Sequence, residues 1–422
     1  MIKRLVCLIL ALSAAFAVTG CTEKEPPPDP VILPAAEAVE DPTGYRVVNP
    51  TQYPDYTFEG APSNMDLRMT AVRAMRDTLS IRWSCTDGIY YCKTGPVSHK
   101  FFQHQPDTTY AGVLYSNAST GIFQFLEYYD QETGRLLFPG DGDDVKHVLG
   151  SSCADCLIWG WNTVCNSIVG SYYPVTMVYA NGYYPVGDYT YDTSISTFNR
   201  LPTNTIIEQN GEAVMLDAYT KVQPADALVS STDNHGMMVI EIPHVVYHPD
   251  GSINKDESYV VIQDQRGGTG AGFYEVEEDG LTMLYSGRTE ATYTFQKLLE
   301  KHFIPVTTAE FAGIKDYEVP TVTASAQTVK ELEDLLAVTV ESNYPLAVVN
   351  AWVEDTQGNR ILLDRACFGG AKDTGVPKAY KLGKLEGLQN FASSAYNQKT
   401  LTVRIEVVTS AGTRHIPVSY II

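Results

Sequence analysis

Cys153 is the residue whose surroundings best suit covalent chemistry. It lies between Ser152 and Asp155, and Ser-x-x-Asp is a capping-box arrangement that starts a helix. We therefore expect Cys153 to be the first helical residue of a segment over Ser151–Val169, whose apolar positions share one face: Leu157, Ile158, Trp161, Val164, Cys165 and Ile168. Free N–H groups and the positive end of the helix dipole favour a nucleophilic thiolate there and suit an oxyanion. The plainer interpretation is a buried cysteine that begins a core helix.

A histidine and a carboxylate lie later in the chain, at the ends of two expected strands. His235 opens the run His235–Ile242, whose first residues are apolar on both faces, as in a buried strand. Asp264 and Gln265 close the run Tyr259–Gln265. If these strands pair antiparallel, Asp264 or Gln265 comes beside His235 and can hold the imidazole tautomer. The alternatives are a core histidine with satisfied hydrogen bonds and a polar pair on an edge strand.

The order of these residues resembles that of the NlpC-type cell-wall hydrolases and the related CHAP amidohydrolases, both papain-like. In those families the cysteine opens a helix that packs on a small antiparallel sheet, as Cys153 would. Their Gly-x-Pro-Tyr element is similar to Gly112-Val113-Leu114-Tyr115, and their Pro-Gly-Asp-Leu-Val step to Pro224-Ala225-Asp226-Ala227-Leu228. Their histidine opens a strand, like His235, and the third residue of the CHAP enzymes ends the next strand, like Asp264.

The resemblance spans residues 65–270, and it departs from the family pattern with Leu114 for Pro, with Ala225 for Gly and at the places that follow. Ser152 stands where Asp or Asn is usual, and Ala154-Asp155 replaces Ser-Gly. A long insertion, Tyr172–Ile207, precedes the strand of the histidine. Activity and substrate are therefore open at this point.

The chemistry implied by the resemblance is acyl transfer without a cofactor or a metal ion. His235 would deprotonate Cys153, which attacks an amide carbonyl, and would then protonate the leaving amine. Tyr115 would help the Cys153 N–H to hold the oxyanion, and Asp264, or alternatively Gln265, would orient the histidine. The implied substrate is a peptide or amide bond in peptidoglycan.

Two other functions fit the same residues. Cys153-Ala154-Asp155-Cys156 is a Cys-x-x-Cys motif at an expected helix start. Such a motif is typical of a thiol–disulfide oxidoreductase, which is the first alternative. The thioredoxin pattern has an aromatic residue just before the first cysteine, and here the motif follows Gly150-Ser151-Ser152. Zinc would need two more ligands at suitable spacing. The second alternative is a non-catalytic surface lipoprotein that binds glycan or protein.

The elements that must position these residues can be read from periodicity. Helical spacing predicts helices over Asn64–Leu79, with Ser63 or Asn64 as the cap, and over Thr292–Phe303. Alternation and apolar runs predict strands over Ala213–Lys221, His235–Ile242 and Tyr259–Gln265, and a hairpin over Phe273–Tyr285 around Asp279-Gly280. The Tyr-rich stretch Ser171–Ile207 is expected to be irregular.

The N-terminus predicts export and attachment to a membrane. Met1–Arg4 is basic, and the apolar run Leu5–Val18 is shorter than the roughly 20 residues of a spanning helix. Val18-Thr19-Gly20-Cys21 resembles a bacterial lipobox, which implies acylation of Cys21. The Pro-rich stretch that follows suits an extended tether. We expect a cell-envelope protein, lipid-anchored to a bacterial membrane on its periplasmic or cell-surface side; an ordinary cleaved signal is the alternative.

The overall charge excludes one class of partner. The formal net charge is −20, whereas nucleic-acid binders are basic, so no nucleic-acid partner is expected. The expected partners are the membrane and a peptidoglycan or peptide substrate.

The character of the chain changes after Phe311. Short alternating runs separated by turn signals predict an antiparallel sandwich, and they are Val319–Ala324, Leu336–Glu341, Ala347–Glu354, Ile361–Leu363, Leu401–Val408 and Thr413–Tyr420. The expected fold is an α+β papain-like domain followed by an all-β immunoglobulin-like sandwich. The expected segments are a signal peptide at 1–20, a lipidated linker at 21–44, a hydrolase domain at 45–314 and the sandwich at 315–422.

Overall fold

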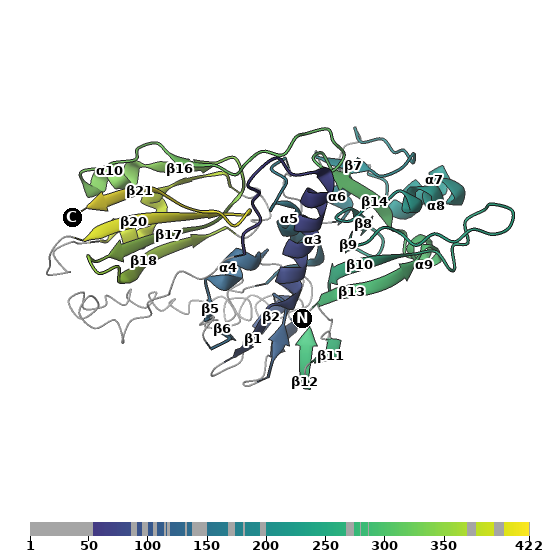
Figure 1. Ribbon diagram of the computed structural model, residues 1–422, viewed down its shortest axis with the longest axis horizontal. Helices are drawn as coiled ribbons and strands as arrows, with labels where there is room; N and C mark the ends of the chain where they lie inside the picture. The colour runs from purple at the N-terminus through teal and green to yellow at the C-terminus, as the bar shows by residue number, and fades with distance from the viewer. Residues whose placement is uncertain are drawn as a thin grey trace, which may run out of the picture. The chain divides into compact units, whose positions relative to one another are not determined.

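The chain is a mixed α/β protein with several sheets, in which most strands pair antiparallel (Figure 1). It is described by a computed structural model over residues 54–85, 91–94, 100–103, 108–113, 115, 119–130, 133–136, 150–167, 174–179, 182–194, 200–266, 274–278, 280–285, 287–368, 377–391 and 401–421. The expected signal segment, Cys21 and the linker lie outside these residues. No helix within the described ranges is long and apolar enough to cross a membrane.

Two helices lie together at the start of the candidate site. α3 (Asn64–Ser80) begins after Ser63, which forms a capping box with Asp66, so the predicted helix and its cap are confirmed. α5 (Cys153–Trp161) begins after Ser152 and packs against α3.

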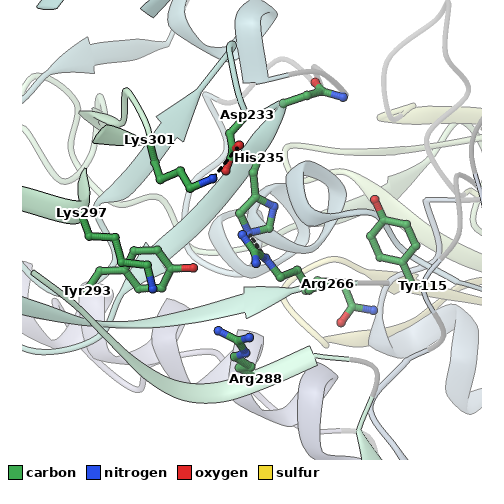
Figure 2. A pocket seen from close by; sticks show the side chains of 10 residues that line it. Tyr115, Asp233, His235, Arg266, Arg288, Tyr293, Lys297 and Lys301 are labelled. Atoms are coloured by element: carbon green, nitrogen blue, oxygen red, sulfur yellow. Dashed lines mark hydrogen bonds and ion pairs between the residues drawn. The ribbon is translucent and has the colours of Figure 1, made fainter. Parts of the chain in front are cut away.

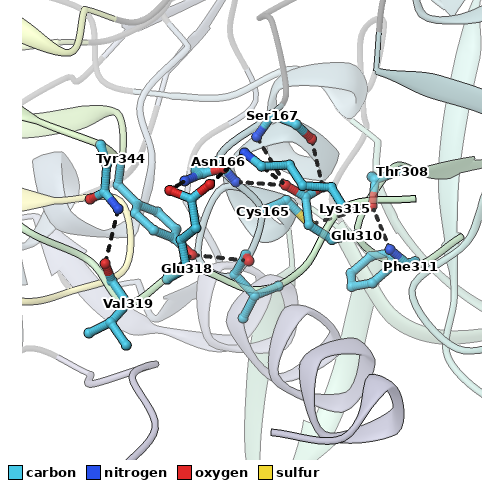
Figure 3. A network of polar contacts seen from close by, with 12 residues as sticks. Cys165, Asn166, Ser167, Thr308, Glu310, Phe311, Lys315, Glu318, Val319 and Tyr344 are labelled. Carbon is cyan, nitrogen blue, oxygen red and sulfur yellow. Dashed lines mark hydrogen bonds and ion pairs between the residues drawn. The ribbon is translucent and has the colours of Figure 1, made fainter. Parts of the chain in front are cut away.

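α5 ends at Trp161 and is shorter than the sequence predicts, and Glu310 binds the residues that follow its last turn. The carboxylate of Glu310 accepts hydrogen bonds from the backbone N–H groups of Asn166 (3.2 Å) and Ser167 (3.1 Å), and from the Ser167 hydroxyl (2.6 Å). These N–H groups are therefore not available to continue the helical ladder. Figure 3 shows this network, in which Lys315 also lies 4.0 Å from Glu310.

The sheet behind α5 has six strands and brings distant segments together. Its order is β13-β10-β9-β8-β14-β7, and every pairing in it is antiparallel. Its strands are β7 (Tyr183–Pro185), β8 (Ala227–Ser230), β9 (His235–Val239), β10 (Tyr259–Gln265), β13 (Gly287–Thr294) and β14 (Ile304–Thr308). β8, β9 and β14 are buried along their whole length, and together with α3 and α5 they contribute to one hydrophobic cluster.

Four short helices flank this sheet in the chain, and one of them corrects the sequence analysis. They are α6 (Pro174–Tyr179), α7 (Thr203–Asn210), α8 (Glu212–Thr220) and α9 (Phe295–Glu300). The strand predicted over Ala213–Lys221 is wrong, because that segment is α8. Its buried residues, Met215, Leu216, Ala218 and Tyr219, follow helical spacing, and a short apolar run does not by itself distinguish the two elements.

A second six-stranded sheet has the order β11-β12-β4-β1-β6-β5. Its strands are β1 (Arg82–Cys85), β4 (Tyr110–Ala111), β5 (Tyr129–Asp130), β6 (Arg135–Leu136), β11 (Tyr274–Glu278) and β12 (Leu281–Tyr285). The predicted hairpin around Asp279-Gly280 is confirmed as β11–β12. Nearby in sequence are α4 (Ile122–Leu126) and the two-stranded sheet of β2 (Tyr91–Thr94) and β3 (Lys100–Gln103).

The C-terminal strands form two antiparallel sheets of their own, with orders β15-β16-β19 and β18-β17-β20-β21. They are β15 (Val322–Ala324), β16 (Thr339–Ser342), β17 (Leu346–Glu354), β18 (Arg360–Cys367), β19 (Ala379–Lys381), β20 (Thr402–Thr409) and β21 (Arg414–Ile421). The short helices here are α10 (Leu332–Ala337), η3 (Leu382–Lys384) and α11 (Glu386–Gln389). The strand predicted from Leu336 is wrong in its first part, because α10 continues to Ala337 and β16 starts only at Thr339.

Candidate active site

Cys153 is the first residue of α5, as the capping box predicts. The Ser152 hydroxyl donates to Asp155 Oδ2 at 2.6 Å, and the Asp155 N–H donates to Ser152 Oγ at 3.3 Å. These two bonds fix the helix start, so the N–H groups of Cys153 and Ala154 have no carbonyl of a preceding turn to bind. The start of α5 therefore offers donors and a positive dipole end beside the Cys153 sulfur.

His235 and Asp264 are brought together by the pairing of β9 with β10. The register, with Ile262 opposite Val239 and Gln263 opposite Met238, lays the end of β10 alongside the start of β9. His235 Nε2 lies 3.1 Å from Asp264 Oδ2, and the carboxylate is fully buried. A carboxylate only accepts hydrogen bonds, so in this contact Nε2 carries the proton and donates it.

Arg266 adds a cation to this pair. Its Nε lies 3.2 Å from Asp264 Oδ2. The same atom lies 3.4 Å from His235 Nε2, a contact that Figure 2 marks with a dashed line. Because Nε2 is already a donor toward Asp264, the guanidinium donates to the carboxylate. Asp264 Oδ2 is thus shared by the imidazole and the guanidinium, which fixes its orientation.

The charge state of His235 depends on Cys153. Burial alone would lower the pKa of His235, but a negative charge on Cys153 and hydrogen bonds to Asp264 and Cys153 raise that pKa to about 9. Since Asp264 takes Nε2, the nitrogen left for the sulfur is Nδ1. The arrangement therefore favours an imidazolium at His235 next to the Cys153 sulfur.

Tyr115 lies near the same sulfur and can serve as a hydrogen-bond donor. It forms an isolated parallel bridge with Ser151, two residues before Cys153. Burial, then the charges of Cys153 and Asp155, raise the pKa of the Tyr115 hydroxyl well above its usual value. The phenol therefore stays protonated at neutral pH.

The structure distinguishes between the two candidates for the residue that orients the histidine. Gln265 donates through Nε2 to the carbonyl oxygen of Val113 at 2.6 Å, whereas Asp264 contacts His235. Of the two, the carboxylate is the one that can hold the imidazole.

The second cysteine of the Cys-x-x-Cys motif is poorly suited to thiol exchange. Cys153 and Cys156 are both free thiols. Cys156 is buried, and burial together with the charges of Asp155 and Cys153 raises the pKa of its thiol far above the usual value. Exchange requires a thiolate, so Cys156 would react slowly at neutral pH. In the described part of the chain no group of three or more His, Cys, Asp or Glu side chains is arranged to hold a metal ion.

A pocket of about 440 Å³ opens beside the histidine. His235, Tyr115 and Gln265 line it together with four basic side chains: Arg266, Arg288, Lys297 and Lys301. Cys153 is only 5% exposed and is not one of the lining residues. A substrate that enters this pocket therefore meets the imidazole and the phenol before it reaches the sulfur.

The basic side chains of the pocket were not predicted from the sequence. Arg266 follows Asp264 by two positions, but nothing in the sequence shows that it turns back on the imidazole. Lys297 and Lys301 are spaced i, i+4 where the sequence predicts a helix, a signal that puts two cations on one face. That signal gave no indication of which site they would face.

Searches against protein-family models, curated proteins and solved structures found no match to this chain.

Proposed function

We propose that this protein is a lipid-anchored cysteine hydrolase that cleaves an amide or peptide bond, with peptidoglycan as the substrate. The observation that carries the proposal is the hydrogen-bonded set at the start of α5: Cys153 contacts His235, and His235 contacts Asp264 at 3.1 Å. A thiol, an imidazole and a carboxylate in this order can activate the thiol and return its proton to a leaving amine.

In the proposed reaction His235 Nδ1 takes the proton of Cys153, and the sulfur attacks the carbonyl carbon. The Cys153 N–H and the Tyr115 hydroxyl stabilise the oxyanion that forms. Collapse of this intermediate breaks the C–N bond, and the imidazolium gives its proton to the leaving amine. A water molecule, deprotonated by His235, then attacks the thioester, so that the carboxylic acid leaves and the thiol is restored. Asp264 keeps the imidazole in the required tautomer throughout.

The proposal includes a papain-like fold for residues 45–314. α5 packs against β9, and the histidine opens that strand. Ala225 adopts a φ of +69°, in the left-handed region that favours glycine, and it stands where the NlpC-type step has its glycine. For residues 315–422 we propose an immunoglobulin-like sandwich, which the two antiparallel sheets there support.

The site of action follows from the N-terminus. A signal segment, acylation of Cys21 and a Pro-rich tether would export the protein and anchor it to a membrane of the cell envelope, on the side where peptidoglycan lies. Several acyl chains contribute about 0.8 kcal/mol per buried methylene, which suffices for firm attachment.

One observation favours a second candidate function, a non-catalytic surface lipoprotein. Cys153 is 5% exposed, so a carbonyl group reaches its sulfur only if the neighbouring side chains move apart. A protein that only binds glycan or peptide in the pocket needs no such movement.

Labelling and turnover by the full chain decide between these functions. A hydrolase is expected to react rapidly with iodoacetamide at Cys153 near neutral pH and to release soluble peptides or muropeptides from peptidoglycan. Cys153→Ala should abolish both, whereas Cys156→Ala, the matched control three residues away, should leave both largely intact. A slowly reacting Cys153 with no release would support the binder instead. A reversible disulfide between the two cysteines, with no release of peptides by the wild type, would support the oxidoreductase.

A further inference from the structure

We propose that the pocket beside His235 binds a carboxylate carried by the leaving-amine part of the substrate, and that Lys297 and Arg288 select for it. This inference rests on the proposed hydrolase function and adds the chemistry of the substrate to it.

The first argument is the charge of the pocket. Four basic side chains line it against one acidic side chain, Asp233, although the whole chain has a net charge of −20. The acidic surface as a whole repels anions, so the local excess of cations is a feature of this pocket. A positively charged wall in a recess raises the local concentration of anionic ligands.

The second argument concerns which cations are already engaged with carboxylates. Lys301 lies 3.5 Å from Asp233, and Arg266 lies 3.2 Å from Asp264. Lys297 instead lies with its Nζ 3.9 Å from the centre of the Tyr293 ring, and it forms no ion pair with a carboxylate among the described residues. A ring contact holds the ammonium in place without neutralising its charge, so Lys297 remains available to an anion from outside.

Arg288 contributes a directional hydrogen-bond donor beside the charge of Lys297. It lies on β13 opposite Asp264 of β10, and its guanidinium contributes to the pocket wall. A guanidinium presents two parallel N–H groups that match the two oxygens of a carboxylate. Lys297 can therefore attract a carboxylate by its charge, and Arg288 can bind the two oxygens of that carboxylate with two parallel N–H groups.

The third argument is the side of the site on which these residues lie. In Figure 2 Tyr115 lies to one side of His235, whereas Tyr293 and Lys297 lie to the other. The imidazole must give its proton to the leaving nitrogen, so the leaving amine lies next to His235. Tyr115, the proposed oxyanion donor, marks the opposite, acyl side. The walls formed by β13 and α9 therefore face the amine part of the substrate.

The test compares matched substrates on the full chain. The substrates are stem peptides isolated from peptidoglycan and the same peptides with their carboxylates converted to amides. We expect kcat/KM to be roughly tenfold or more higher for the free acids, as a charged hydrogen bond would give. Lys297→Gln and Arg288→Gln should each remove most of this preference by slowing the acids far more than the amides. Lys330→Gln, which changes an exposed lysine outside the pocket, should keep it.

A binding measurement separates this proposal from the hydrolase function. In calorimetric titrations, the Cys153→Ala variant should bind the free-acid peptides more tightly than the amidated ones. The double variant with Cys153→Ala and Lys297→Gln should bind the two kinds of peptide equally. Preferential binding without turnover by the wild type would overturn the hydrolase and keep the pocket assignment. Turnover with equal rates on acids and amides, or a preference that Lys297→Gln leaves intact, would overturn the pocket assignment alone. Absence of both turnover and binding would overturn both.

Discussion

His235 and Asp264, 29 positions apart, meet through a 3.1 Å contact between Nε2 and Oδ2. The contact exists because β9 and β10 pair in a register that sets the first residue of one strand near the end of the other. It decides which imidazole nitrogen remains for Cys153. The strand pairing therefore controls the proton transfers of the proposed reaction.

Replacing Asp264 with Asn should slow the reaction and change its pH dependence. Asn keeps the shape but loses the charge that favours the imidazolium, so kcat/KM should fall by about 100-fold or more. The hydrogen bond to the Asp264 carboxylate and its negative charge both raise the pKa of His235, which is about 9, so the loss of the charge lowers that pKa. In a plot of the rate of Cys153 alkylation against pH, the change at alkaline pH that reports His235 should thus move to lower pH. Asp256→Asn, at an exposed position just before β10, is the control; a change that stays at the same pH in Asp264→Asn would contradict the assigned role.

The imidazolium should also stabilise the fold in a defined pH range. The pKa of His235 in the folded protein, about 9, lies above its usual 6.5, so the stabilisation is complete below pH 6.5 and is lost as pH rises through about 9. The difference in free energy of unfolding between wild type and His235→Gln should therefore shrink over this range. Denaturant titrations at several pH values measure it. A difference that stays constant with pH for His235→Gln would exclude the pairing.

The close approach of α5 to β9 should depend on the absence of a side chain at Gly236. A Cβ there would lie 2.8 Å from Leu157 Cδ1, so in Gly236→Ala either the Leu157 side chain or α5 itself must shift relative to the strand that carries His235. We expect a loss of about 1–3 kcal/mol in unfolding free energy and slower alkylation of Cys153. Gly60→Ala, where no atom lies within 4 Å of the added Cβ, controls for the substitution itself. Unchanged alkylation in a folded Gly236→Ala variant would show that the spacing is not critical.

Elements with strong local signals could be predicted from the sequence. Helical spacing after Ser63 or Asn64 predicted the start of α3, and the capping box at Ser152 predicted the start of α5. The run Tyr259–Gln265 matches β10 residue for residue, since its first part, Tyr259–Ile262, is apolar and rich in β-branched residues. In each case residues adjacent in sequence determine the local structure.

Features that depend on distant contacts could not be predicted. The backbone of Asn166 and Ser167, which the sequence places in a longer helix, is instead bonded to Glu310, more than 140 positions away. Segment Glu212–Thr220 lies on a helix because its apolar face is buried, which a short apolar run does not reveal. The choice of Asp264 over Gln265 needed the register of β9 against β10, and no local signal encodes a register between strands separated by a long loop.

Arg68 and Asp226 form a buried ion pair whose disruption should destabilise the protein without touching the reacting groups. Arg68 Nη1 lies 2.7 Å from Asp226 Oδ1, and the two side chains are only 5% and 2% exposed. Asp226→Ala leaves a buried guanidinium without its carboxylate at the entry to β8, so unfolding free energy should fall by about 3–5 kcal/mol. The control is the exposed pair of Lys221 and Asp188, also 2.7 Å apart, in which the side chain of the Asp is 83% exposed. Asp188→Ala should cost at most about 1 kcal/mol, because water screens exposed pairs. Denaturant unfolding of the two variants measures the contrast, and equal losses would mean that the buried pair contributes no more than a surface contact.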